Sequence, residues 1–177
     1  MQHHTRTVVS VVCRIAICFC ALFLMVGYLM VQPSAGDSKG AQRVSASSIQ
    51  IEPTDPGDTP IPPDFRISIY ENLIMQIEKT GKFQHVYRSG DKDAANAPDL
   101  VTLRTTAQSF TQGSQKKREV TTVMGATSLT LKVRITDHAG QTIVDRDVQG
   151  KVRFMGENLG ATYDFSKKVA KIVRDTF

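Results

Sequence analysis

Cysteine, tryptophan and histidine are scarce in this sequence of 177 residues, and their scarcity excludes several kinds of site. The three cysteines, Cys13, Cys18 and Cys20, all lie in the first 20 residues, and tryptophan is absent. No disulfide and no thiolate metal site is therefore expected beyond residue 20. His85 and His138 are the only histidines outside the first four residues, too few and too isolated to predict a zinc site.

A strong excess of one charge is also missing. The chain has 22 Lys and Arg residues against 17 Asp and Glu residues, a formal net charge of +5. A nucleic-acid-binding protein usually carries a dense stripe of basic residues, and a net charge of +5 is much smaller than such a stripe supplies. No nucleic-acid partner is therefore predicted. The sequence also lacks a nucleophile elbow, a phosphate-binding loop, a zinc-protease motif and a dinucleotide-binding glycine pattern. We therefore predict no enzymatic activity, no cofactor and no metal.

The first 31 residues carry a long apolar run. Residues 15–31 (IAICFCALFLMVGYLMV) contain no charged residue, and Arg6 and Arg14 precede them. A helix over this run spans about 25 Å, and one that also includes residues 8–13 is longer than a bilayer core needs. Residues 1–31 are therefore predicted to form a membrane anchor or a signal segment. An uncleaved anchor is favoured, because a good small-x-small cleavage site does not follow.

The anchor also predicts where the rest of the protein lies. A short N-terminal tail and a long C-terminal part favour export of the C-terminal domain. No lipobox is present, because Cys18 and Cys20 are followed by further apolar residues. We expect a membrane-anchored protein whose domain is periplasmic or associated with the outer membrane, or a secreted domain if the segment is cleaved.

Residues 32–63 are predicted to form a linker. Six of the seven prolines lie there, with Ser, Asp and Gly around them, and such segments are extended and semi-rigid. Within the linker, residues 43–51 (RVSASSIQI) alternate loosely between apolar and polar. This pattern predicts a first, edge-like strand, which Pro53 ends.

Residues 64–177 show the periodicities of helices and strands. Phe65, Ile69, Leu73 and Ile77 recur every four residues and predict a helix that ends near Gly81. A second amphipathic helix is predicted at the C-terminus. Strands are predicted over residues 83–88, 100–110, 128–136 and 142–154, with a bulge or bend at Gly150 and a polar loop over residues 111–127.

These elements predict an α+β fold. Two amphipathic helices cannot bury their apolar stripes on each other and also cover one-sided strands. The economical arrangement is a two-layer sandwich, with one mostly antiparallel sheet of four to five strands and both helices on one face. The other face of the sheet is then left open to solvent.

Several segments resemble one bacterial family. They are KTGKF (79–83), PDLV (98–101), LVTLRTTAQSFTQGSQKKREVTTVMGATSLTLKVRITD (100–137), VDRDVQGKVRF (144–154) and NLGATYDFSKKVAKIVRDTF (158–177). They are similar to the family known as domain of unknown function 4410, over roughly residues 49–177. The resemblance implies a small, exported, lipoprotein-like envelope protein, and no catalytic residue carries over with it.

Basic residues on the polar faces of the predicted strands form the candidate binding site. They are Arg104, Lys132, Arg134 and Lys151. If the strands are neighbours, the open face gathers these side chains into a cationic patch that suits lipid head groups, an anionic glycan or an acidic partner. The alternative is an ordinary charged face, which Asp145 and Asp147 partly neutralise.

The sequence favours a non-enzymatic interaction or assembly module of the bacterial envelope. Its expected partners are the membrane, through residues 1–31, and an envelope protein or further copies of the chain. One alternative is a structural subunit of a homo-oligomeric envelope complex. A less favoured alternative is a hydrolase of envelope polymers that uses Asp145 and Asp147, two carboxylates on one side of a strand.

Overall fold

The structure, a computed structural model, describes residues 44–121, 125–153 and 156–177. The predicted membrane anchor over residues 1–31 lies outside the described residues. Within the described part of the chain, no helix combines the length and the apolar character needed to cross a membrane. The described residues all belong to one unit, residues 41–177.

Five strands form one sheet, whose spatial order is β2-β1-β3-β4-β5. β1 pairs in parallel with both β2 and β3, whereas β3, β4 and β5 pair antiparallel. The sheet is therefore mixed, and the expectation of a mostly antiparallel sheet holds for β3, β4 and β5 but missed the two parallel pairings of β1. The strands are β1 (Ser48–Ile51), β2 (His85–Arg88), β3 (Leu100–Thr111), β4 (Thr127–Thr136) and β5 (Thr142–Val152).

The parallel pairs arise from the helix that separates the first two strands. α2 (Pro63–Glu78) connects β1 to β2, and a helical crossover is the usual way to bring two sequential strands into parallel register. β1 is consequently an interior strand, in which Ile49 and Ile51 are fully buried. The expectation of an edge-like first strand is therefore wrong. Pro53 follows the strand and takes no part in its pairing.

Part of the predicted linker packs against the sheet. The Asp55 backbone N–H donates to the Thr105 carbonyl at 2.9 Å, and the Asp55 carbonyl accepts from the Ala107 N–H at 2.9 Å. Thr54 and Ile61 are buried. Residues 52–55 thus follow the side of β3. α2 begins at Pro63, where a proline is well tolerated because the first helical N–H has no partner inside the helix.

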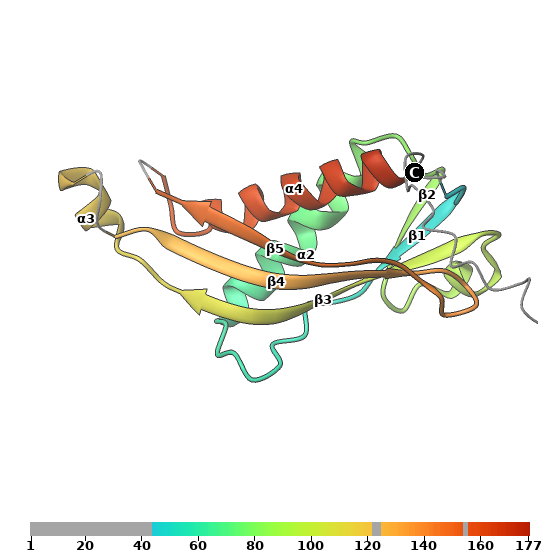
Figure 1. Ribbon diagram of the computed structural model, residues 1–177, viewed down its shortest axis with the longest axis horizontal. Coiled ribbons are helices and arrows are strands. Elements are labelled where there is room, and N and C mark those ends of the chain that lie inside the picture. The colour runs from blue at the N-terminus through green and yellow to red at the C-terminus, as the bar shows by residue number, and fades with distance from the viewer. Residues whose placement is uncertain (1–43, 122–124, 154–155) are drawn as a thin grey trace, which may run out of the picture. The chain divides into compact units, whose positions relative to one another are not determined.

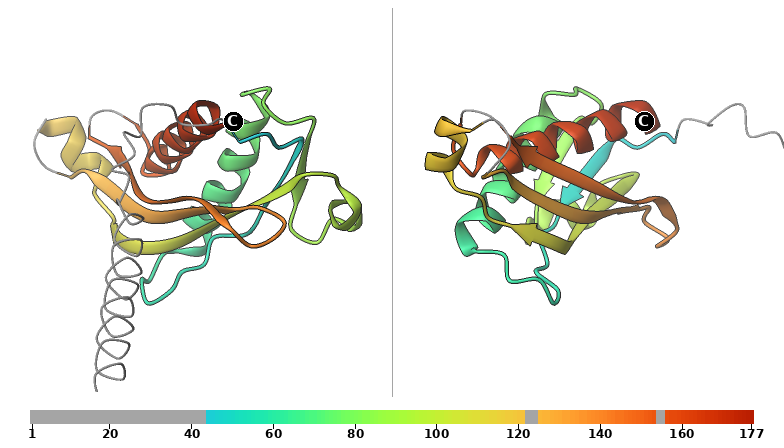
Figure 2. Two further views of the ribbon diagram at one scale, coloured as in Figure 1. Left: turned by 45° about the vertical axis from the view of Figure 1, so that its right-hand side comes forward. Right: turned by 60° about the vertical axis from the view of Figure 1, so that its left-hand side comes forward.

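α2 and α4 (Gly160–Thr176) cover one face of the sheet, as Figures 1 and 2 show. The alternating residues of β4 with odd numbers, from Leu129 to Ile135, are fully buried beneath them, whereas their even-numbered neighbours are not. The α+β class is confirmed. The predicted polar loop over residues 111–127 contains a short helix, α3 (Gln115–Val120), and a 3-10 helix, η1 (Lys92–Asn96), precedes β3.

The two long helices are joined by polar side chains near their first turns. Ser68 and Thr162 hydroxyls lie 2.7 Å apart, and the Asn72 amide donates to Thr162 Oγ1 at 3.0 Å. Further along, Gln76 of α2 and Ala170 of α4 line the same hollow. The helices therefore run in the same direction, and their C-terminal ends lie at the same end of the layer.

Gly150 is the point at which α4 approaches β5 most closely. A Cβ atom at this position would collide with the Ala161 carbonyl oxygen and would lie 2.7 Å from Phe165 Cβ. The register shifts of the sheet lie elsewhere, at Ala107–Ser109 in β3 and at Ile135–Thr136 in β4. The bulge predicted at Gly150 is therefore wrong, and the glycine permits close helix packing instead.

Side chains of α4 also occupy part of the outer edge of β5. The Lys151 backbone N–H donates to Asp164 Oδ2 at 3.0 Å, and Lys168 Nζ donates to the Gln149 carbonyl at 2.8 Å. Asp164 and Lys168 form an ion pair with each other at 2.7 Å. At this end of β5, backbone groups that face away from β4 therefore have partners from the helix.

Candidate functional site

The open face of the sheet holds the four predicted binding residues. Arg104 and Arg134 are direct register partners across β3 and β4, and Lys132 lies two positions from Arg134 on the same strand. Lys151 lies further along β5, opposite Ser128. The structure therefore brings Arg104, Lys132 and Arg134 together and leaves Lys151 apart from them.

Two acidic residues, Glu52 and Asp145, compensate part of this positive charge. Arg104 donates two hydrogen bonds to the Glu52 carboxylate, both at 2.9 Å, and Arg134 donates two to Asp145, at 3.1 and 2.9 Å. Lys132 Nζ lies 3.6 Å from Asp145 Oδ1. Among the described residues, only Lys151 of the four has no ion pair. The open face is thus a network of paired charges.

The network sets the ionisation of its members. The hydrogen bonds from Arg134, helped by the positive charge of Lys132, lower the pKa of Asp145 below its ordinary value. The hydrogen bond to Glu52 likewise raises the pKa of Arg104. Asp145 is therefore held as a carboxylate at neutral pH and is poorly suited to donate a proton. The hydrolase alternative would need such a donor.

The two histidines that the structure describes, His85 and His138, do not gather into a metal site. His85 stacks on Tyr87, with ring centroids 5.8 Å apart, and His138 is exposed in the hairpin between β4 and β5. Over residues 44–121, 125–153 and 156–177, no three His, Cys, Asp or Glu side chains form a group that could hold a metal ion.

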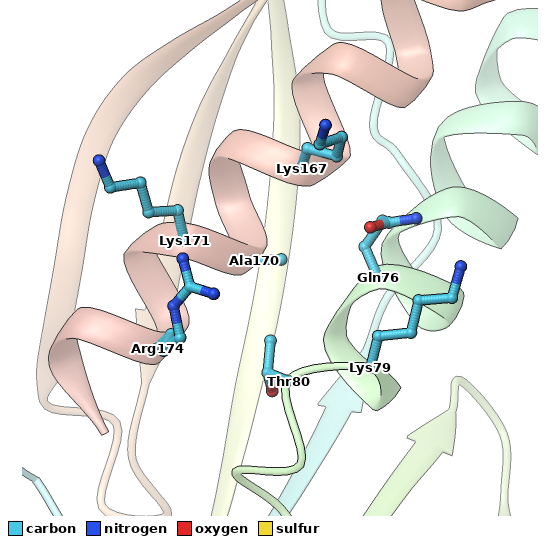
Figure 3. A pocket seen from close by; sticks show the side chains of 7 residues that line it. All are labelled: Gln76, Lys79, Thr80, Lys167, Ala170, Lys171 and Arg174. Carbon is cyan, nitrogen blue, oxygen red and sulfur yellow. The ribbon is translucent and has the colours of Figure 1, made fainter.

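A basic hollow lies between α2 and α4, and Figure 3 shows the side chains around it. Its volume is about 170 Å³. α4 and the end of α2 supply four cations and one amide, and none of the lining residues is acidic. The lining residues are Gln76, Lys79, Thr80, Lys167, Ala170, Lys171 and Arg174. We call this the α2–α4 hollow.

Sequence patterns did not predict this hollow. The periodicity of residues 160–177 places Lys167, Lys171 and Arg174 on the polar side of α4, where they read as an ordinary solvated face. Their convergence with Gln76 and Lys79 depends on the parallel packing of the two helices. One sequence feature could have indicated the hollow. Gln76 is a polar residue next to Ile77, which belongs to the series of core residues that recur every four positions in this helix.

A second, more apolar hollow lies at the start of α2. Its volume is about 350 Å³, and Ile67, which lines it, has 63% of its surface exposed. At its rim, the Glu71 carboxylate accepts two hydrogen bonds of 2.7 Å from Arg88. The lining residues are Pro53, Thr54, Pro63, Arg66, Ile67, Tyr70 and Glu71. We call this the Ile67 hollow.

Arg118 of α3 is a buried cation that sequence analysis also missed. Only 4% of its surface is exposed, and its guanidinium donates to the Gly125 carbonyl at 2.6 Å and to the Gly156 carbonyl at 2.8 Å. It also donates to Asn158 Oδ1 at 2.9 Å. Arg118 thus joins α3 to the segment that enters α4. A shallow hollow of about 560 Å³ lies beside this junction, lined in part by Ser114 and Asn158.

Comparison with known proteins shows the fold. No protein-family model matches this chain, and no curated protein sequence matches it. A variant of the PelC dodecamer from Paraburkholderia phytofirmans is similar in structure, with 10% identity and a TM-score of 0.55 over 75% of this chain and 91% of that chain. A second structure of the PelC dodecamer has 10% identity and a TM-score of 0.53 over 71% and 87%.

A further solved structure, CT253 from Chlamydia trachomatis, has 7% identity and a TM-score of 0.45 over 72% of this chain and 93% of that chain. At these identities, the two PelC structures show that this chain shares their fold, and they assign no residue of this chain a role.

Proposed function

We propose that this protein is a non-enzymatic subunit of a homo-oligomeric assembly in the bacterial envelope. The observation that carries the proposal is the likeness of its fold to a protein that forms dodecamers, over 91% of that protein's chain. The charge pairing of Asp145 supports the non-enzymatic part, because this carboxylate is engaged by Arg134 and Lys132.

The envelope location rests on the N-terminal segment. The apolar run over residues 15–31 is long enough for a bilayer when residues 8–13 extend the helix, so residues 1–31 would hold the protein to the membrane and the exported domain would follow it. The predicted resemblance of residues 49–177 to domain of unknown function 4410 implies the same location, although no family model matches this chain. The resulting molecule would be a membrane-tethered interaction module.

The Ile67 hollow is the surface that we propose for contact between copies. Exposed apolar side chains around a hollow are typical of protein–protein contacts. Ile67 is exposed over 63% of its surface, and Met75 further along α2 over 38%. The open sheet face is less suitable, because its charges already have partners within the chain.

The full-length chain, extracted in a non-ionic detergent, tests the proposal by native mass spectrometry. We expect a complex of several copies, and a subunit mass that includes residues 1–31. The variant Ile67→Ser should shift the population to monomers, because it removes an apolar contact without disturbing the core. Val120→Ser is the matched control, since Val120 is 84% exposed on α3, outside the Ile67 hollow.

Three results would each contradict a part of the proposal. A wild-type protein that is monomeric at all concentrations would exclude a stable homo-oligomer. A complex that survives Ile67→Ser unchanged would exclude the Ile67 hollow as the contact. A subunit mass that begins near residue 36 would show that the N-terminal segment is cleaved, and the protein would then be secreted rather than tethered.

A further inference from the structure

The α2–α4 hollow differs from the other charged surface of the domain in that its charges are not compensated. On the open sheet face, Arg104 and Arg134 each have a carboxylate partner within 3 Å. In the hollow, Lys79, Lys171 and Arg174 have no ion pair among the described residues, and Lys167 lies over the Tyr163 ring at 5.6 Å. Positive charge is therefore concentrated there without an internal counter-charge.

A buried amide lines the same hollow. Gln76 is 92% buried, with 8% of its surface exposed, and its Nε2 has no hydrogen-bond partner. A buried amide without a partner costs free energy, so such groups in folded proteins usually meet an ordered water, an ion or a bound molecule. Figure 3 shows Gln76 on α2 and Lys167 on α4 on either side of the hollow. The amide can offer its donor to a bound group by rotation of its last side-chain bond.

The helix ends explain only part of this arrangement. Lysine and arginine in the last turn of a helix stabilise it by compensating its dipole, and Lys79 and Arg174 lie at such ends. Lys167 lies in the middle of α4, and Gln76 is uncharged, so the helix dipole accounts for neither. A ligand with negative charge and several acceptor atoms accounts for the four cations and the amide together.

We propose that the α2–α4 hollow binds a phosphate group. Its volume of about 170 Å³ corresponds to about five or six waters, which is enough for one tetrahedral anion. Its lining cations and amide come from two helices, and Figure 3 shows Lys171 and Lys79 extended to opposite sides of it, so these side chains must turn inward to contact a ligand. A tetrahedral oxyanion has acceptor atoms on every side for such donors, whereas a planar carboxylate is matched best by a single guanidinium.

The test uses the full-length chain in a non-ionic detergent at fixed ionic strength. Inorganic phosphate is titrated and its binding is followed by calorimetry, first with the wild type. We expect saturable binding that weakens by about tenfold or more in the double variant Lys167→Gln, Arg174→Gln. The double variant Lys117→Gln, Arg146→Gln removes the same charge from α3 and β5, outside the hollow, and should bind as the wild type does.

The variant Gln76→Leu separates the ligand site from a purely structural role. Leucine has nearly the volume of glutamine and removes the unpartnered buried amide, so the variant should unfold at the same temperature or a higher one. Its affinity for phosphate should nevertheless fall several-fold. Unchanged affinity in this variant would show that Gln76 takes no part in binding.

The source of the phosphate group is tested by a second titration. Dihexanoylphosphatidylglycerol, a short-chain lipid, is added to the phosphate-loaded protein. Tighter binding of this lipid than of phosphate would identify a lipid head group as the ligand, and weaker binding would identify a soluble phosphate. The proposal is overturned if neither molecule saturates the wild type, or if the two charge variants weaken binding equally.

Discussion

Single buried polar residues define the junctions of this domain. Arg118 is the clearest case, because its guanidinium donates only to neutral oxygens, and these lie on four different residues. Such a residue is costly to bury and costly to remove. Lys116 and Lys117 precede it in the sequence and are exposed, so the run of three basic residues contains one buried member that its composition does not reveal.

Replacement of Arg118 tests its role as a junction. The variant Arg118→Met should lower the free energy of unfolding by about 3 kcal/mol, because the Gly125 and Gly156 carbonyls lose a charged donor. Urea denaturation followed by circular dichroism measures this change. Lys117→Met removes the same charge from an exposed neighbour and should change the stability little. Equal losses in both variants would show that charge alone, and not the buried contacts, matters.

The ionisation of Asp145 gives a second residue-level prediction. Arg134 lowers its pKa, so its ion pair contributes stability above the ordinary value of 3.8 and this contribution is lost as the pH falls through the lower, folded value. Arg134→Gln should raise the pKa of Asp145 towards 3.8. Carbon-detected NMR titration of the Asp145 carboxyl group measures the shift.

Arg146→Gln is the control for this titration. Arg146 is the chain neighbour of Asp145, but successive strand residues point to opposite faces. It should leave the pKa of Asp145 nearly unchanged. An equal shift in both variants would mean that the general positive field, rather than the hydrogen bonds from Arg134, holds the carboxylate ionised.

At the level of elements, the periodicity of apolar residues predicted the type and position of the helices and strands, which depend on local sequence. The strict alternation from Leu129 to Ile135 gave β4, and the four-residue spacing from Phe65 to Ile77 gave α2. The interior position of β1 and its parallel pairing were missed, because neither pattern says which strands are neighbours or in which direction they run. The four predicted cations were placed on the correct face, but the pairing of Arg104 with Glu52 involves a residue from the predicted linker.

Gly150 of β5 and Gly160 of α4 both lie near the first turn of α4, and we expect replacement by alanine to have opposite effects on stability at the two positions. Gly150→Ala places a Cβ against Ala161 and Phe165, so α4 must move, and we expect a loss of about 2 kcal/mol in the free energy of unfolding. Gly160→Ala meets only Val152, at 3.6 Å, and should stabilise the protein by about 0.5 kcal/mol. Thermal unfolding compares them, and similar effects of both substitutions would contradict the close packing at Gly150.

At the level of the whole molecule, the arrangement of layers decides which surfaces are available. Both long helices lie on one face of the sheet, so the buried core is enclosed between them and β1, β3, β4 and β5 (Figure 2). The opposite face carries paired charges, and the outer side of the helices carries the α2–α4 hollow and the Ile67 hollow. Binding of an anion and contact between copies would therefore use different parts of the same helical layer.

The side chains of α4 on the outer edge of β5 have a consequence for aggregation. An exposed edge strand has unpaired N–H and C=O groups that can pair with a strand of another chain, and repeated pairing of this kind leads to fibrils. Asp164 and Lys168 hold the Lys151 N–H and the Gln149 carbonyl, the groups that an incoming strand would need at that end. Closer to the hairpin, Asp145, Arg146 and Asp147 place three successive charges on the same strand. The outer edge of β5 is thus protected at both places, and copies of this chain can be crowded together without their sheets joining edge to edge there.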